Sequence, residues 1–143
     1  VHCGDQAAPQ RHRSQRLVGL WKHNASRGNG RCATCRCHRG QSVVVRDQAC
    51  IAVEAMEGTD DMLRRASNMA DNQRLTLIKV SKPNQDMRFD VPVVGLPTIR
   101  LMVEVNASAL AIDAGRTLLF DRSNLIKLAD ENGITISAFR PDN

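Results

Sequence analysis

The chain has 143 residues, of which 42% are hydrophobic and only 3% aromatic, and its formal net charge is +5. This length is sufficient for one domain with its own core, and the composition requires that core to be aliphatic. No segment has the roughly 20 consecutive apolar residues of a membrane-spanning helix, and no signal peptide is recognisable. The sequence therefore predicts a cytoplasmic protein.

The positive charge is unevenly distributed along the chain. Residues 1–40 contain eight Lys or Arg residues and one acidic residue, whereas residues 41–143 contain twelve basic and fourteen acidic residues. Residues 1–39 show neither a helical nor a strand periodicity, and so polar a segment cannot offset the entropy lost on ordering. They are predicted to be a disordered basic tail, either natural or the product of an out-of-frame or mis-assigned start. Residues 40–143 are predicted to form one domain.

Four of the five cysteines lie in this tail. Cys32 and Cys35 have the Cys-x-x-Cys spacing of half a zinc site. The other candidate ligands, Cys37 and His38, follow almost directly, whereas a zinc site normally takes its second half from a distant segment. A zinc site is therefore not favoured. The fifth cysteine, Cys50, is interpreted as a small, buried apolar residue.

The first half of the predicted domain begins with a hairpin. A strand over 41–47 and an alternating segment over 50–56 are separated by a tight turn, which is typical of two paired strands. A helix over 61–71 follows, with Thr59 or Asp60 as its cap and acids in its first turn. A second apolar strand then covers 75–80.

The second half alternates strands and helices. The pattern first predicts a short extended piece at 93–95, a helix from Pro97 to about Asn106 and a strand over 109–113. It then predicts an extended piece at 117–120, a helix that Asp121 or Ser123 caps and Gly133 ends, and a last strand over 134–139. This alternation predicts an α/β fold: a mixed or mainly parallel sheet with helices packed on it.

The segment between Lys82 and Pro92 is the most informative part of the chain. Prolines near both ends disfavour a helix and predict a loop of fixed shape. Two carboxylates, Asp86 and Asp90, can hold Mg²⁺, while Lys82 and Arg88 can hold phosphate. The combination points to metal-assisted phosphoryl chemistry. The alternative is a solvated loop in which the acidic and basic side chains pair with each other.

Three other polar segments adjoin predicted strands: Gln41-Ser42, Glu57-Gly58-Thr59-Asp60 and Ala114-Gly115-Arg116-Thr117. Loops that converge at strand ends form the sites of open α/β sheets, so the four segments are expected to line one crevice. The helix start at Thr59 and Asp60 favours anions, although a plain helix cap explains these two residues equally well. No His follows residue 40, so a histidine base within the domain is excluded.

Taken in order, these residues resemble the C-terminal domain of the bacterial UDP-2,3-diacylglucosamine pyrophosphatase family of lipid A biosynthesis, over about residues 40–140. The matching segments are Gly40-Gln41-Ser42-Val43-Val44-Val45, Val53-Glu54-Ala55, Glu57-Gly58-Thr59-Asp60, Lys82-Pro83 with Gln85, Asp86, Arg88, Asp90 and Pro92, then Gly95, and Ala114-Gly115-Arg116-Thr117. The resemblance implies a Mg²⁺-dependent hydrolase that splits the diphosphate of UDP-2,3-diacylglucosamine into UMP and 2,3-diacylglucosamine 1-phosphate.

The resemblance also implies roles for individual residues. Asp86 is the expected catalytic acid. Metal contacts are expected from Asp86, Asp90, Glu57 and Asp60, and substrate contacts from Gln41, Ser42, Thr59, Lys82, Arg88 and Arg116. The expected partner is a lipid nucleotide like UDP-diacylglucosamine, with peripheral contact to the inner membrane surface and no nucleic acid.

The chain departs from the family at its beginning. Family members carry a whole N-terminal domain, with the substrate between the two domains, and residues 1–39 do not match it. Two alternatives to an active hydrolase therefore stay open. One is a non-catalytic remnant whose basic tail binds nucleic acid or anionic lipid by charge, although this tail has one Trp and no Phe or Tyr for base stacking. The other is an α/β interaction domain.

Overall fold

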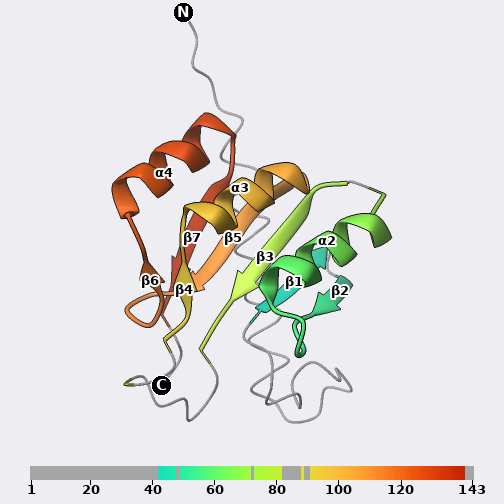
Figure 1. Cartoon of the computed structure of the whole chain (residues 1–143), viewed down its shortest axis with the longest axis horizontal. Helices are drawn as coiled ribbons and strands as arrows, with labels where there is room; N and C mark the ends of the chain where they lie inside the picture. Colours follow the sequence, from blue (N-terminus) through green and yellow to red (C-terminus); the bar gives the residue numbers. More distant parts are fainter. Residues whose placement is uncertain (1–41, 48, 72, 82–87, 89–90, 141–143) are drawn as a thin grey trace, which may run out of the picture.

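The computed structural model describes residues 42–47, 49–71, 73–81, 88 and 91–140. In this part of the chain, five strands form one sheet in the order β2-β1-β3-β5-β7, and two further strands, β4 and β6, pair separately (Figure 1). The strands are Ser42–Arg46 (β1), Ala49–Val53 (β2), Leu75–Lys79 (β3), Val93–Val94 (β4), Ala107–Asp113 (β5), Leu118–Leu119 (β6) and Thr135–Phe139 (β7). The helices are Thr59–Met69 (α2), Leu96–Glu104 (α3) and Arg122–Glu131 (α4).

The sheet is mixed, which confirms the predicted fold class. β1 runs antiparallel to both of its neighbours, β2 and β3, while β3, β5 and β7 run parallel to one another. Ser42 at the start of β1 therefore pairs with Lys79 at the end of β3, and Asp113 at the end of β5 pairs with Phe139 at the end of β7. The start of β1 and the ends of β2, β3, β5 and β7 thus meet along one side of the sheet, here called the carboxyl edge.

The main core lies between the sheet and the three helices, which lie together over one face in Figure 1. The side chains of successive strand residues point to opposite faces, so Leu75 and Leu77 of β3 face the helices while Ile78 joins a smaller apolar cluster on the other side. The largest fully buried side chains of this main core, from the helices and the sheet together, are Met62, Leu63, Leu75, Leu77, Ile99, Met102, Leu110 and Leu125. All are aliphatic or Met, as the low aromatic content predicts.

The predicted hairpin of β1 and β2 is confirmed, with its turn at Asp47. β2 ends at Val53 rather than at residue 56, because the chain leaves the sheet and turns at Gly58 into α2. The expectation that Cys50 is buried is wrong. This residue is exposed, since β2 is the outermost strand on its side of the described sheet. None of the helices in the described ranges is long and apolar enough to cross a bilayer.

The predicted side-chain caps of two helices are also wrong. The residue before α2 is Gly58, and no side chain caps that end, so neither Thr59 nor Asp60 has this role. The residue before α4 is Asp121, as predicted, but it adopts the left-handed conformation and its carboxylate accepts the Asn124 amide instead of a backbone N–H. An N-cap that bonds the backbone normally has extended dihedral angles, which Asp121 does not have.

Gly58 is expected to be indispensable to the turn that precedes α2. Its dihedral angles, φ 85° and ψ 167°, fall in a region that only glycine occupies readily. A Gly58→Ala substitution should lower the free energy of unfolding by about 1–3 kcal/mol, as measured by urea titration. A Cβ at this position would meet no atom within 4 Å, so the cost would come from the backbone alone.

The matched control is Gly95→Ala, which changes the glycine that precedes α3. Gly95 has extended dihedral angles of φ −126° and ψ −179°, which any residue adopts, and a Cβ there would touch the Pro97 Cδ at an ordinary 3.4 Å. This variant should unfold almost as the parent does. Equal losses of stability in the two variants would contradict the backbone explanation.

Candidate functional site

Four polar side chains meet at the carboxyl edge, around the hydroxyl of Thr59 in the first turn of α2. Its Oγ1 lies 3.0 Å from Glu54 Oε1, 3.1 Å from Lys79 Nζ and 3.2 Å from Ser42 Oγ. The four residues come from the start of β1, the end of β2, the start of α2 and the end of β3. The strand order brings Ser42 and Lys79 to Thr59, although they lie 17 and 20 residues away from it in the sequence. This group is here called the Thr59 network.

The hydroxyl of Thr59 has no further hydrogen-bonding capacity. A hydroxyl donates one hydrogen bond and accepts two. Because Glu54 is an acceptor and Lys79 a donor, Thr59 donates to the Glu54 carboxylate and accepts from the Lys79 ammonium. Its remaining lone pair accepts from the Ser42 hydroxyl, whose side chain is fully buried. Thr59 therefore connects three strands to α2.

Lys79 is the cation of this network. Burial lowers the pKa of its ammonium group from the ordinary value of 10.5, while the nearby charges of Glu54 and Asp60 act in the opposite direction. Removing a charge from water is costly, which is why burial lowers this pKa. A partly buried cation with a perturbed pKa at the edge of a sheet is a candidate binding-site residue.

The lowered pKa of Lys79 predicts a pH dependence of stability. Since the pKa is lower in the folded state than in the unfolded state, unfolding takes up a proton at any pH between the two values. The free energy of unfolding should therefore rise with pH across this window, up to about pH 10.5. Relative to a Lys79→Met variant, the parent should gain stability between pH 7 and pH 10 in urea titrations. A constant difference between the two proteins would show that Lys79 titrates normally.

A second polar contact lies beside the first, where β3 and β5 end. Asp113 is buried, and its Oδ2 accepts both the backbone N–H and the hydroxyl of Ser81, each at 2.9 Å. Ser81 is the last described residue before the segment 82–90. The contact fixes the direction in which the chain leaves β3. Sequence analysis did not select Asp113, although an acid that ends an apolar strand was a visible signal.

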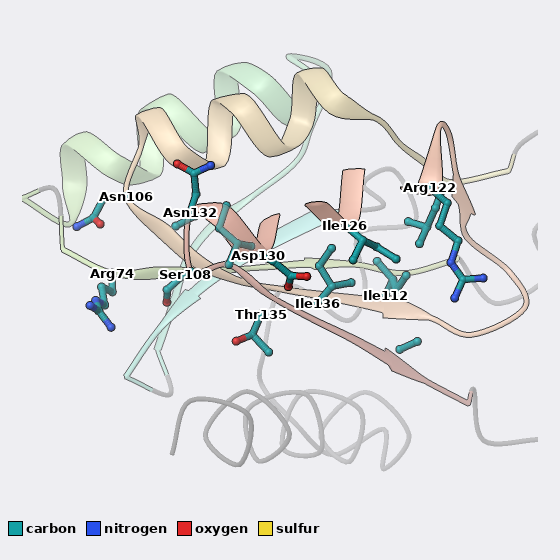
Figure 2. Close-up of a pocket in the computed structure, with 15 residues that line it drawn as sticks. Arg74, Asn106, Ser108, Ile112, Arg122, Ile126, Asp130, Asn132, Thr135 and Ile136 are labelled. Atoms are coloured by element: carbon teal, nitrogen blue, oxygen red, sulfur yellow. The ribbon is translucent and has the colours of Figure 1, made fainter. Parts of the chain in front are cut away.

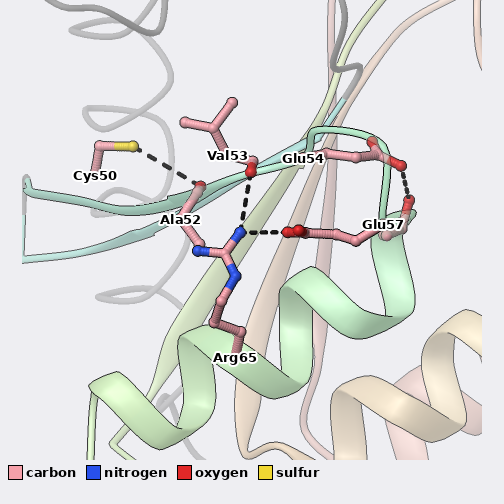
Figure 3. Close-up of polar contacts among 7 residues, drawn as sticks. Cys50, Ala52, Val53, Glu54, Glu57 and Arg65 are labelled. Carbon is pink, nitrogen blue, oxygen red and sulfur yellow. Dashed lines mark hydrogen bonds and ion pairs between the residues drawn. The ribbon is translucent and has the colours of Figure 1, made fainter.

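Glu57 has a different partner from the one expected. Its carboxylate forms an ion pair with Arg65, whose guanidinium also donates to the backbone carbonyl of Val53 at 3.2 Å (Figure 3). The Arg65 side chain thus ties the middle of α2 to the end of β2. Glu57 is partly exposed, and this pair would have to be rearranged before the carboxylate could hold a metal ion.

The structure brings some of the predicted site residues together and leaves others undescribed. Ser42 and Thr59 lie in the Thr59 network, and Asp60 acts electrostatically on Lys79. Arg116 is exposed in the turn after β5, and Arg88 is exposed too. Four predicted residues lie outside the described ranges: Gln41, Lys82, Asp86 and Asp90. The Cys32-x-x-Cys35 segment and the basic tail lie outside them as well.

The predicted magnesium site is incomplete in the part of the chain that can be described. There, no three acidic, Cys or His side chains lie close enough to hold a metal ion. Two of the four predicted metal ligands, Glu57 and Asp60, lie in the described ranges. Glu57 forms an ion pair with Arg65, whereas Asp60 forms no ion pair with a described basic side chain. The remaining oxygen donors would have to come from Asp86 and Asp90. The magnesium site stays a prediction.

A cavity of about 730 Å³ lies elsewhere, along β5, β7 and α4 (Figure 2). Its lining combines aliphatic side chains, among them Ile112, Ile126 and Ile136, with polar ones such as Arg122 and Asp130. It contains no residue of the Thr59 network. We place the candidate site at the carboxyl edge and not in this cavity, because only the carboxyl edge gathers the polar segments that adjoin the strands.

Comparison with known proteins shows the family. A family model described as the LpxI C-terminal domain matches residues 31–137. The chain belongs to this family. The UDP-2,3-diacylglucosamine pyrophosphatase LpxI of Caulobacter vibrioides is 36% identical over 109 residues, which cover 71% of this chain. The chain spans only 39% of the length of that protein, so the LpxI match concerns one part of a longer relative.

A solved structure gives a weaker match. The diaminohydroxyphosphoribosylaminopyrimidine deaminase/5-amino-6-(5-phosphoribosylamino)uracil reductase of Thermotoga maritima is 17% identical to this LpxI-family chain. The match covers 90% of this chain and 37% of that one, with a TM-score of 0.44. A similarity this low carries no argument about function.

Proposed function

We propose that the chain acts in the hydrolysis of UDP-2,3-diacylglucosamine to UMP and 2,3-diacylglucosamine 1-phosphate. The observation that carries the proposal is the convergence, in a member of the LpxI family, of a partly buried Lys79 with Glu54, Thr59 and Ser42 at the carboxyl edge. A buried cation next to hydroxyl groups suits a phosphate-bearing ligand, since charge-assisted hydrogen bonds to phosphate are strong.

The reaction adds one water molecule across a P–O–P bond, so negative charge increases on both phosphates as the bond breaks. Positive side chains that already surround the diphosphate stabilise this charge without reorganising. Lys82, Arg88 and Arg116 are proposed to supply such contacts. Gln41 is proposed as a further substrate contact, and Ser42 as another that would first have to move its buried hydroxyl away from Thr59. Asp86 is proposed as the catalytic acid.

Magnesium is part of the same proposal. Carboxylates are the ligands that Mg²⁺ takes most readily in proteins, and Asp60, Asp86 and Asp90 would hold it, with Glu57 joining them only after release from Arg65. When bound, the ion would neutralise charge on the diphosphate. The cytoplasmic location and the contact with the inner membrane surface stay predictions.

The experiment measures UMP release by the purified chain from UDP-2,3-diacylglucosamine with Mg²⁺, followed by chromatography. Release should stop in excess EDTA and return when Mg²⁺ is restored. Because the chain spans 39% of its Caulobacter relative, a turnover below that of this longer protein is expected. Complete absence of UMP release would contradict the proposed activity of this chain. Release that EDTA does not affect would contradict the role of the metal.

A further inference from the structure

One carboxylate oxygen in the Thr59 network has no hydrogen-bond partner. Glu54 Oε1 accepts the Thr59 hydroxyl, but Glu54 Oε2 is buried and unpaired. In the described ranges only one other buried side-chain oxygen or nitrogen is unpaired, Thr117 Oγ1, which follows the turn after β5. A buried polar atom without a partner typically costs about 1–3 kcal/mol, and more if it is charged. Glu54 Oε2 is therefore a candidate contact for a bound ligand.

Lys79 has unused donors in the same network. Its ammonium carries three N–H groups, of which one bonds Thr59. Glu54 and Lys79 do not form a direct ion pair in the described structure. Glu54 Oε1 and Lys79 Nζ nevertheless lie 3.0 and 3.1 Å from the same Thr59 oxygen, so these two atoms are separated by no more than the sum of the two distances. A strong acceptor and a strong donor are thus held side by side.

This pair selects its ligand by chemistry. The ammonium of Lys79 disfavours a second cation beside Glu54, so a metal ion does not explain the unpaired oxygen. A single water could bond Glu54 but would leave the two remaining N–H groups of Lys79 without an acceptor of their own. A ligand with an anionic oxygen next to a hydroxyl group satisfies both side chains. A sugar phosphate has this combination.

We propose that Lys79 and Glu54 form a sugar-phosphate subsite, in which Lys79 donates to a phosphate oxygen and Glu54 Oε2 accepts a sugar hydroxyl. Thr59, whose own hydrogen bonds are all used within the protein, is then a positioning residue and does not contact the substrate. The inference deepens the proposed function and rests on it for the identity of the sugar phosphate. In that substrate the sugar is either the ribose of the UMP half or the glucosamine of the lipid half.

The test measures binding by isothermal titration calorimetry with two probes, UMP and glucosamine 1-phosphate, each compared with its phosphate-free form, uridine or glucosamine. At least one phosphorylated probe should bind. Lys79→Met should weaken the binding of that probe at least tenfold, because a hydrogen bond between charged groups is lost. The same substitution should leave the binding of the phosphate-free form unaffected. Glu54→Gln should weaken the binding of both the phosphorylated and the phosphate-free form about three- to tenfold, because a charge-assisted hydrogen bond becomes a neutral one.

Matched controls separate contact from general charge effects. Asp61→Asn removes an exposed acid of the same α2 turn, and Lys127→Met removes an exposed lysine of α4. Both should bind as the parent does.

Thr59→Val should weaken binding, while Thr59→Ser, which keeps the hydroxyl, should restore it. Rescue by the hydroxyl is the result that a purely structural role would not give.

The outcomes also separate this inference from the proposed function. If neither phosphorylated probe binds at millimolar concentration, or if the Lys79→Met and Glu54→Gln proteins bind as tightly as the parent, the subsite is refuted even when UMP release occurs. If the probes bind with the expected variant pattern and no UMP is released, the subsite stands and the hydrolytic function fails.

Discussion

Replacing Asp86 with Ala is expected to reduce UMP release from UDP-2,3-diacylglucosamine by roughly 10²–10⁴-fold, the range over which a positioned acid or base contributes to a reaction. The thermal unfolding midpoint should stay close to that of the parent, because a catalytic acid contributes to the transition state more than to the fold. The measurement is an initial rate at saturating Mg²⁺, alongside a melting curve of each protein.

The control for Asp86→Ala is Asp61→Asn, which removes an exposed acid paired only with a neighbouring arginine at 3.5 Å. It should retain the parent rate within about twofold, because an exposed pair contributes little. An Asp86→Ala protein that releases UMP at the parent rate would rule out the assigned role. A loss of rate accompanied by a loss of folded structure would assign Asp86 to stability instead.

Replacing Asp113 with Ala is expected to cause the largest loss of stability, about 3 kcal/mol, since each hydrogen bond to a buried charged acceptor contributes about 1.5–3 kcal/mol. The substitution leaves the Ser81 backbone N–H and hydroxyl without their shared acceptor. Urea unfolding monitored by circular dichroism measures the effect. UMP release should fall as well, because Ser81 leads directly into the segment that carries Lys82 and Asp86.

Two variants show which part of this contact matters. Ser81→Ala removes only the hydroxyl, which lies 2.9 Å from Asp113 Oδ2, and should cost about 1 kcal/mol. Asp113→Asn keeps an oxygen acceptor and should cost less than Asp113→Ala. If Asp113→Ala and Ser81→Ala were equally stable, the backbone N–H of Ser81 would not depend on Asp113 for its partner.

The elements of the fold could be predicted from local patterns. A β-branched run predicted β1, an alternating segment predicted β2 and an apolar run predicted β3, and the position of Gly133 predicted the end of α4, where this glycine adopts φ +66°. Boundaries failed where a glycine changed the path of the chain. Gly58 made an abrupt turn, so α2 begins at Thr59, earlier than its acidic residues indicated.

The candidate site could be predicted only in part. Helix and strand periodicity shows where each strand ends and so which polar residues adjoin the strand ends, but the roles of those residues stay a prediction. Lys79 and Glu54 were not selected, since a lysine that ends one strand and a glutamate that follows another have no visible relation in the sequence. The two residues become neighbours because both form hydrogen bonds with the hydroxyl of Thr59, Lys79 from the end of β3 and Glu54 from the residue after β2.

Thr59 illustrates the difference between a local and a tertiary role. In the sequence it is a helix-capping or substrate-binding residue, because a hydroxyl at a helix start commonly bonds the backbone. In the structure its hydroxyl is surrounded by stronger partners, a carboxylate that follows β2 and an ammonium at the end of β3, the two strands on either side of β1. Charge-assisted bonds are stronger than a neutral cap, so the tertiary contacts determine where this side chain points.

The strands and helices, the aliphatic core and the resemblance to a pyrophosphatase family follow from the amino-acid sequence alone, because each depends on residues close together in the chain or on the order of short motifs. Which strand ends become neighbours follows only from the folded arrangement. β1 lies antiparallel between β2 and β3, and this places Ser42 beside Lys79 and Glu54 at the carboxyl edge. The reason is physical: periodicity fixes the face on which a side chain lies, whereas the order and register of the strands fix what it meets there.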